Sequence, residues 1–431
     1  MSTKTILVFD PCSDGHHAGY ILNLLRHLDW TDSDYRLQML VSEDFIDRHE
    51  DLIDFTRERL QGRVNWWTLS IKETNSILNA SGSLARGKAE WSVLRKHSKT
   101  IPHDEVLHMY ADYTVSPLAM HSKIRKPFTG ILFRQNLHYP KMFGSNLESS
   151  GKMRTHVKGV LLKMALNHSQ LKSLLCLDNY LPRFFSEEPN GHKLRPCPDP
   201  VYLPDSETLK TPESLKDRSG LTRHKLLLFG VISERKGFGH FLDEANKLSP
   251  EQLNLFSFYV VGPTMEETEG KRVQKALHEL ESKGAHVIRE DRFVRDEEIQ
   301  SYFHASDYIV TPYKAHIGMS AVIVRAAAAG KPVIASDFGL LGKLVNNHRL
   351  GMTFGEQPKQ SVGDLLERVL SGNEIIFDHE EAKRFSSMND ARCFGEAVFG
   401  CFEERRRESI RLSVEANDLS DEGDAIVSKS A

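Results

Sequence analysis

The sequence lacks the features that mark membrane, disulfide-rich or metal-binding proteins. It has five cysteines and no CxxC pair, which argues against a disulfide framework or a thiolate zinc site. Its 20 histidines include no HExxH motif. No apolar run approaches the roughly 18 residues of a membrane-spanning helix. We therefore expect no membrane span, no catalytic metal and no bound cofactor.

An excess of positive charge is lacking too. Lys and Arg number 56 against 59 Asp and Glu, so the formal net charge is -3 and no global field would attract nucleic acid. The chain starts with the strand-like Thr5–Phe9 and shows no signal-peptide region, from which we expect a cytoplasmic protein. With 431 residues, 40% hydrophobic and 27% charged, the sequence is typical of a globular protein of two domains.

Short apolar runs alternate with amphipathic stretches of helical length through most of the chain. This alternation predicts parallel sheets covered by helices on both faces, an α/β fold of two doubly wound, Rossmann-like domains. Prolines and polar residues around position 200 mark the join between them. We predict an N-terminal domain at 1–205, a linker at 206–222, a C-terminal domain at 223–388, a closing helix at 389–410 and a disordered acidic tail at 411–431.

Two such domains predict a cleft lined by the carboxyl ends of their strands. One candidate motif follows the first predicted strand. Its Gly15 and Gly19 would let backbone amides approach a phosphate or a sugar, and His16 and His17 would donate hydrogen bonds. The alternative is a tight turn in which Asp14 caps the helix.

A second motif begins where another predicted strand ends at Gly230. Arg235 and Lys236 follow, and Gly237 opens the next helix. Two adjacent cations just past a strand end supply the fixed positive charge that a diphosphate needs. The alternative is a solvated loop.

A third motif precedes an alanine-rich helix. Its backbone amides would form an anion site facing the second motif, unless Ser320 acts only as an N-cap. A glycine-rich loop at 330–342 suits either a ligand or close helix packing. The residues of the anion site are Gly318, Met319, Ser320 and Ala321.

Five segments between residues 225 and 355 together resemble the C-terminal domain of family-4-like GT-B glycosyltransferases, of the glycosyl transferases group 1 type. They are 230–237, 258–263, 292–298, 305–308 and 326–342. The N-terminal half resembles the family only in its Gly15–Gly19 loop and its layout. The resemblance implies a GT-B fold, a nucleotide-sugar donor held by the second domain, an acceptor held by the first, and metal-independent transfer with retention.

By position, Lys236 matches the lysine that contacts donor phosphates, and Arg235 would substitute for the arginine that the family places at Val231. The family's Glu-x7-Glu pattern, which touches the donor sugar and ribose, falls on Ile317 and Arg325. Both glutamates are absent, and Arg325 would instead pair with a phosphate or a carboxylated sugar.

The family commonly places a histidine of the N-terminal domain over the reacting sugar. His138, after the predicted strand 130–133, is the first candidate, and His16, His17 and His108 are alternatives.

A predicted helix at 151–172 is basic and has no acidic residue. It would either dock on anionic lipid or hold a charged acceptor, or pack its apolar residues in the core with its lysines solvated. The apolar residues are Met153, Val157, Val160, Leu161 and Met164.

The sequence thus predicts a retaining glycosyltransferase of the polysaccharide-biosynthesis kind, cytoplasmic or peripheral to the inner face of the membrane. It would move a sugar from a nucleoside-diphosphate sugar to a hydroxyl of a glycan, lipid-linked or small-molecule acceptor. The missing glutamates make a non-catalytic glycan- or nucleotide-binding protein the main alternative. A phosphorylase or a sugar-nucleotide isomerase would also use such a cleft.

Overall fold

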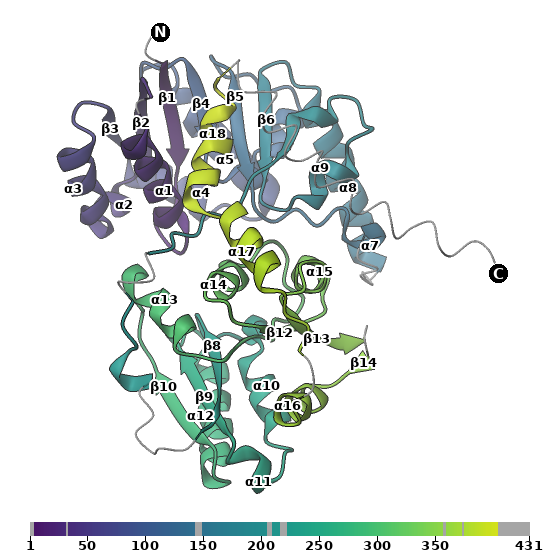
Figure 1. The fold of residues 1–431 in the computed structure, drawn as a ribbon. Helices are drawn as coiled ribbons and strands as arrows, with labels where there is room; N and C mark the ends of the chain where they lie inside the picture. The colour runs from purple at the N-terminus through teal and green to yellow at the C-terminus, as the bar shows by residue number, and fades with distance from the viewer. Residues whose placement is uncertain are drawn as a thin grey trace.

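The computed structural model describes residues 4–31, 33–142, 149–204, 209–215, 222–356, 359–372 and 375–403. Within these residues two α/β domains lie one above the other, as Figure 1 shows. The predicted tail at 411–431 and part of the predicted linker at 206–222 lie outside the described residues.

The N-terminal domain is built on a seven-stranded, all-parallel sheet of order β3-β2-β1-β4-β5-β6-β7. Its strands are β1 (Lys4–Asp10), β2 (Tyr35–Ser42), β3 (Val64–Leu69), β4 (Glu105–His108), β5 (Phe128–Leu132), β6 (Leu171–Cys176) and β7 (Leu194–Pro196). The helices around it are α1 (His17–Trp30), α2 (Glu43–Arg48), α3 (Glu50–Arg59), α4 (Ile71–Leu78), α5 (Ser83–His97), α6 (Val115–Ala119), α7 (Tyr139–Met142), α8 (Ser149–Leu166) and α9 (Tyr180–Phe184).

The C-terminal domain repeats this plan in the order β10-β9-β8-β11-β12-β13-β14, with β14 antiparallel. Its strands are β8 (His224–Phe229), β9 (Phe256–Val261), β10 (His286–Glu290), β11 (Tyr308–Thr311), β12 (Val333–Ser336), β13 (Gly351–Glu356) and β14 (Lys359–Gln360). Its helices are α10 (Phe238–Ala245), α11 (Pro250–Leu253), α12 (Glu267–Ser282), α13 (Asp296–His304), α14 (Ala321–Ala328), α15 (Gly339–Asn347), α16 (Val362–Leu370) and α17 (His379–Met388).

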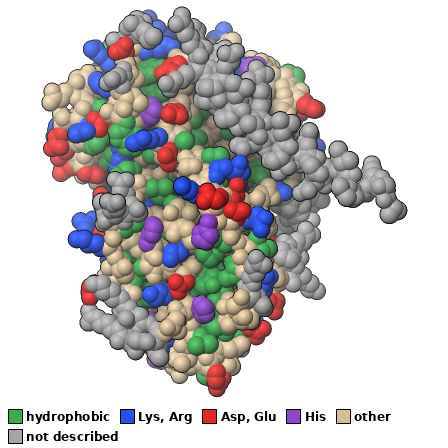
Figure 2. All heavy atoms as spheres, viewed as in Figure 1, with side chains coloured by type: hydrophobic (Ala, Val, Ile, Leu, Met, Phe, Trp, Pro, Cys, Tyr) green, Lys and Arg blue, Asp and Glu red, His purple; other side chains and the backbone are tan. Residues whose placement is uncertain are grey.

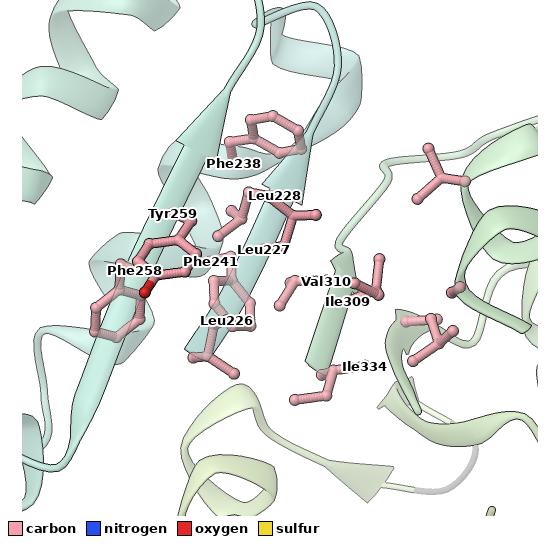
Figure 3. Packing of buried hydrophobic residues seen from close by; sticks show 14 of the residues in the cluster. Leu226, Leu227, Leu228, Phe238, Phe241, Phe258, Tyr259, Ile309, Val310 and Ile334 are labelled. Atoms are coloured by element: carbon pink, nitrogen blue, oxygen red, sulfur yellow. The ribbon is translucent and has the colours of Figure 1, made fainter. Parts of the chain in front are cut away.

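Continuous apolar runs form the central strands because both faces of each sheet are covered. In the C-terminal core, Leu226–Leu228 of β8 pack between β9 and β11, with Phe238 and Phe241 of α10 over one face (Figure 3). The two doubly wound domains predicted from the alternation of apolar runs are confirmed.

In both sheets the order in which strands are added reverses at the first strand. In the N-terminal sheet β1 lies between β2 and β4, and in the C-terminal sheet β8 lies between β9 and β11. At such a switch point the loops after the two central strands separate and leave a crevice at the carboxyl ends. The loops that follow β1, β8 and β11 therefore start at the two crevices.

The last described helix, α18 (Ala391–Gly400), returns to the N-terminal domain and packs on α1. Phe394 and Phe399 enter the core formed by β1, β2 and α1, and the ring of Phe399 stacks on His27. Val201 donates its backbone N–H to the carbonyl of Asn389, so the two crossings between the domains lie side by side.

The basic helix differs from its prediction in two ways. It is α8, which ends at Leu166, and Lys172 belongs to β6. Its apolar residues do not all face the core, since Met153, Val157, Val160 and Met164 are exposed. The alternative prediction, that these four side chains pack in the core, is therefore wrong. No helix among the described residues is long and apolar enough to cross a membrane.

Candidate active site

The two domains enclose a cleft of about 810 Å³ at the carboxyl ends of their strands. On the face shown in Figure 2, charged and histidine side chains gather across the waist where the domains meet. Most of the residues predicted for the site line this cleft. They are Gly15, His16, Gly19, Arg235, Lys236, Gly318, Met319, Ser320, Ala321 and Arg325.

Glycines set the position of the two predicted phosphate-binding cations. Lys236 Nζ lies 4.0 Å from the ring centroid of Tyr313. A Cβ added at Gly230 would lie 3.6 Å from the same Nζ atom. Gly237 has φ +68°, and a Cβ there would meet the Pro312 carbonyl at 2.0 Å. Gly230 and Gly237 are not among the residues lining the cleft, and their role is to position Arg235 and Lys236.

Arg235 is held by a neutral histidine. Its Nη1 donates to His316 Nδ1 at 2.9 Å, so Nε2 carries the proton and donates to the Met319 carbonyl at 3.2 Å. Burial, together with smaller effects of the nearby cations Lys236, Arg235 and Arg134, lowers the pKa of His316 to about 4. His316 was not predicted, although it lies between motif residues.

The N-terminus of α14 is not wholly free. Gly318 donates its backbone N–H to Tyr139 Oη at 2.9 Å, so the prediction of an available amide is wrong at this residue. Ser320 occupies the N-cap position but its side chain makes no capping hydrogen bond. Met319, Ser320 and Ala321 lie at the start of the helix, where the partial positive charge of the helix favours an anion.

Tyr139 belongs to the N-terminal domain yet packs in the core of the other domain. Its ring lies against Gly339, where a Cβ would approach within 2.8 Å. The preceding His138 is fully buried, and its Nε2 lies 2.9 Å from Asp178 Oδ2. The structure does not bring His138 to the cleft, and its observed contacts fix the segment that carries Tyr139.

Among the candidate histidines of the N-terminal domain His16 lines the cleft, and His49, which was not a candidate, lines it too. The ring of His16 stacks on His17 at 5.0 Å and packs on Phe133 at 5.0 Å. Burial lowers its pKa to about 4, with smaller effects of His17 and Arg134. His17 does not line the cleft, and its Nδ1 lies 2.8 Å from each oxygen of Asp10, which fixes the ring that supports His16.

Arg325 meets carboxylates of the protein. It is 8% exposed, its Nη2 lies 3.6 Å from Asp296 Oδ1 and its Nη1 lies 3.5 Å from the Tyr202 carbonyl. Asp199 also lines the cleft here and accepts a hydrogen bond from Tyr20 at 2.5 Å. The charge of Arg325 is therefore partly neutralised before any ligand binds.

Among the other cleft residues that the sequence analysis did not select, two lie just after strands. Arg134 follows β5 and is exposed, and Phe293 follows β10 and is 80% exposed. The rule that ligands bind at strand ends would have found both, had it been applied to every strand.

One group among the described residues has the composition of a metal site. Side-chain atoms of Asp10, Cys12 and His17 lie within 4.8 Å of one another. The group fits a cation poorly, because Arg86 donates to Cys12 Sγ at 3.2 Å and His17 is already bonded to Asp10. Burial, followed by the charge of Asp10, also raises the pKa of the Cys12 thiol to about 12.

Comparisons with known proteins agree with this geometry. Residues 223–371 match the family model described as glycosyl transferases group 1. No curated protein matches the chain. A glycosyltransferase from Rickettsia africae is 16% identical with a TM-score of 0.63, and the match covers 95% of this chain and 100% of that one.

Anabaena HepE in complex with UDP is 15% identical with a TM-score of 0.60, and the match covers 93% of this chain and 99% of that one. For sucrose-phosphate synthase from Thermosynechococcus elongatus the identity is 14%, the TM-score 0.59 and the coverage 97% and 98%. At these identities the likeness shows the fold. The chain therefore has the GT-B fold, and its residues 223–371 match the glycosyl transferases group 1 family.

Proposed function

We propose that the protein is a retaining, metal-independent glycosyltransferase that moves a sugar from a nucleoside-diphosphate sugar to a hydroxyl of a glycan, lipid-linked or small-molecule acceptor. The observation that carries the proposal is the convergence of Arg235, Lys236 and the start of α14 on one wall of the cleft, opposite His16 and Arg134. The family match and the UDP bound to HepE support a nucleotide-sugar donor.

Charge develops on the leaving diphosphate as the glycosidic bond breaks. Arg235 and Lys236 stabilise this charge, and the amides at the start of α14 add partial positive charge. The neutral His316 holds Arg235 without adding a competing charge. Because the cations are fixed before the reaction, little reorganisation is needed in the transition state.

The acceptor hydroxyl attacks the anomeric carbon on the face that the diphosphate leaves. One C–O bond to phosphate breaks, one C–O bond to the acceptor forms, and the hydroxyl proton passes to the released phosphate oxygen. No enzyme nucleophile is required. His16, neutral at pH 7, orients hydroxyl groups beside the reacting centre as a hydrogen-bond donor or acceptor.

A non-catalytic nucleotide- or glycan-binding protein is the second candidate. Two observations favour it. Ile317 and Arg325 stand where the family has its two donor-contacting glutamates. The backbone N–H of Gly318 is already donated to the Tyr139 hydroxyl. A nucleotide-binding protein would bind the same nucleotide as the transferase, so turnover is needed to separate the two.

The experiment measures the melting temperature with UDP, GDP, ADP, CMP and their sugar conjugates. A ligand at 100 times its dissociation constant adds about 2.7 kcal/mol to the stability of the native state. We expect one nucleotide family to stabilise the wild type and to stabilise Lys236→Ala less. Lys314→Ala is the matched control, because Lys314 is two residues from the cleft residue His316 but is not among those lining it.

The same nucleotide is then supplied as its sugar conjugate, with and without candidate acceptors. Release of nucleoside diphosphate that depends on an acceptor supports the transferase. Stabilisation without any release supports the binding protein. The absence of a shift with every nucleotide would refute the donor site.

A further inference from the structure

Helix α8 exposes a continuous row of apolar side chains. Met153 is 71% exposed, Val157 49%, Val160 44% and Met164 42%. Their spacing of four, three and four residues places them on one stripe of the helix. Leu162, Ala165 and Leu166 lie on the opposite face and are buried. The exposed stripe is therefore additional to the face that packs on the domain.

Cations flank this stripe. Arg154 and Lys158 lie on one side of it and Lys163 on the other, since each residue advances the helix by about 100°. No Asp or Glu occurs between Ser149 and Leu166. Lys163 bonds to Glu188 at 2.5 Å, whereas Arg154 and Lys158 make no ion pair among the described residues.

The positive surface continues past the C-terminal end of α8. The segment after α6 is tied to this end, because His168 Nε2 lies 3.2 Å from the Ser122 carbonyl and the rings of His168 and His121 stack at 6.0 Å. The segment also exposes an apolar residue beside basic ones. The exposed residues are Met120, His121, Lys123 and Arg125.

We propose that α8 docks this face on an anionic lipid surface. The apolar stripe would lie at the boundary between headgroups and acyl chains, and the flanking arginine and lysines would reach the lipid phosphates. A convex stripe bordered by cations on both sides complements a flat anionic surface. A second copy of the chain fits less well, because pairing two α8 helices would bring Arg154 and Lys158 of both copies together, and α8 itself has no acidic residue to pair with them.

The position of α8 connects this surface to the cleft. Phe133 and Arg134 line the cleft at the end of β5, and the chain continues from them through α7 toward α8. Figure 1 shows α7 and α8 at the same edge of the N-terminal domain. This step rests on the proposed function. Of the glycan, lipid-linked and small-molecule acceptors proposed there, docking of α8 on a membrane favours the lipid-linked one.

Vesicle co-sedimentation of the full chain tests the proposal. Vesicles of phosphatidylcholine alone are compared with an equal mixture of phosphatidylcholine and phosphatidylglycerol. We expect binding to the mixed vesicles at low salt and weaker binding at high salt. Arg154→Glu/Lys158→Glu should lower the affinity at least about fivefold for each cation removed. Val157→Asp/Met164→Asp should abolish binding at either salt concentration.

Two control variants introduce the same types of substitution, apolar to Asp and cation to Glu, at surface positions outside α8. Met265→Asp replaces an exposed apolar residue outside the patch, and Lys275→Glu replaces an exposed lysine of α12. Both should bind vesicles as the wild type does. All the replaced side chains are exposed, so unchanged melting temperatures should show that the variants fold.

Equal sedimentation with both kinds of vesicle, or binding that survives the α8 changes, would overturn the proposal. So would a wild-type dimer that Val157→Asp/Met164→Asp converts to a monomer, since the stripe would then cover a second copy. Nucleotide titration of the same proteins separates the two proposals. The α8 variants should still bind nucleotide, and Lys236→Ala should still bind vesicles.

Discussion

His16 and His316 lie on opposite walls of the cleft, close to Arg134; His316 is half-buried, and His16 is exposed to the cleft. Burial lowers the pKa of each to about 4, so both are neutral in the folded protein at pH 7. A neutral His316 accepts the hydrogen bond of Arg235, and protonation would place a third positive charge beside Arg235 and Lys236. Acid should therefore disturb the phosphate-binding wall.

His316→Asn should reduce the sensitivity of the protein to acid. The folded pKa lies below the unfolded one, so the unfolded chain binds more protons and stability falls as pH decreases from about 6.5 to about 4. Removing the group should lessen the loss of unfolding free energy over this range by about 2 kcal/mol, one pKa unit being worth about 1.4 kcal/mol. Urea unfolding at pH 4.5 and 7 measures the difference.

His278→Asn, on the exposed side of α12, is the control and should leave the pH dependence as in the wild type. An equal loss of stability in His316→Asn and in the wild type would contradict the effect of burial.

At the scale of elements, the turn after β8 and the first turn of α1 use glycine for different reasons. Gly237 has φ +68° and touches the backbone of Pro312, whereas a Cβ at Gly19 meets nothing within 4 Å. Glycine at 237 is thus required by the backbone. At position 19 the protein itself leaves room for a side chain, so only a bound ligand would require glycine there.

Gly237→Ala should destabilise the protein by about 1–3 kcal/mol and weaken nucleotide binding, because the strained turn carries Arg235 and Lys236. Gly19→Ala should instead stabilise α1 by about 0.5–1 kcal/mol. Denaturant unfolding measures both changes. Equal stability of the two variants would contradict the assigned role of Gly237.

The strand ends and the glycine-rich turns could be predicted because apolar runs and glycine are local signals. The partners of the site residues could not. Tyr139 and Gly318 are 179 positions apart, and His138 and Asp178 are 40 apart, so no local pattern reveals that one amide is occupied or that one histidine is buried. In α8 the helical spacing of apolar residues in the sequence identifies apolar positions. It does not reveal which face of the helix packs against the domain.

At the scale of the molecule, two aromatic side chains are among the contacts that hold the domains in their observed arrangement. Phe394 of α18 brings the end of the described chain back to α1, and Tyr139 joins the N-terminal domain to α14. The second contact lies within the proposed donor site. Closure of the domains and access to the Gly318 amide are therefore coupled.

Tyr139→Phe should remove the acceptor for the Gly318 N–H and leave the ring in place. The hydroxyl also bonds to the Leu340 backbone and the Asp178 side chain, so its loss should cost at least about 1 kcal/mol of stability. Because the amide becomes available to a phosphate, nucleoside diphosphate should bind as tightly as to the wild type or more tightly. Thermal unfolding and calorimetric titration measure the two effects.

Tyr259→Phe, in the same core but with its hydroxyl near Leu215, should alter stability without altering nucleotide affinity. Weaker nucleotide binding by Tyr139→Phe would show that the hydroxyl supports the donor site instead of competing with it.

Calorimetric titration with a nucleoside diphosphate, set against the same nucleoside without phosphates, tests the central claim most directly. The base is the one identified by thermal stabilisation. We predict that the diphosphate binds, that the nucleoside binds at least about tenfold more weakly, and that Lys236→Ala loses most of this difference whereas Lys314→Ala retains it. Equal affinity for the two ligands, or an unchanged difference in Lys236→Ala, would contradict a phosphate-binding site at Arg235, Lys236 and α14.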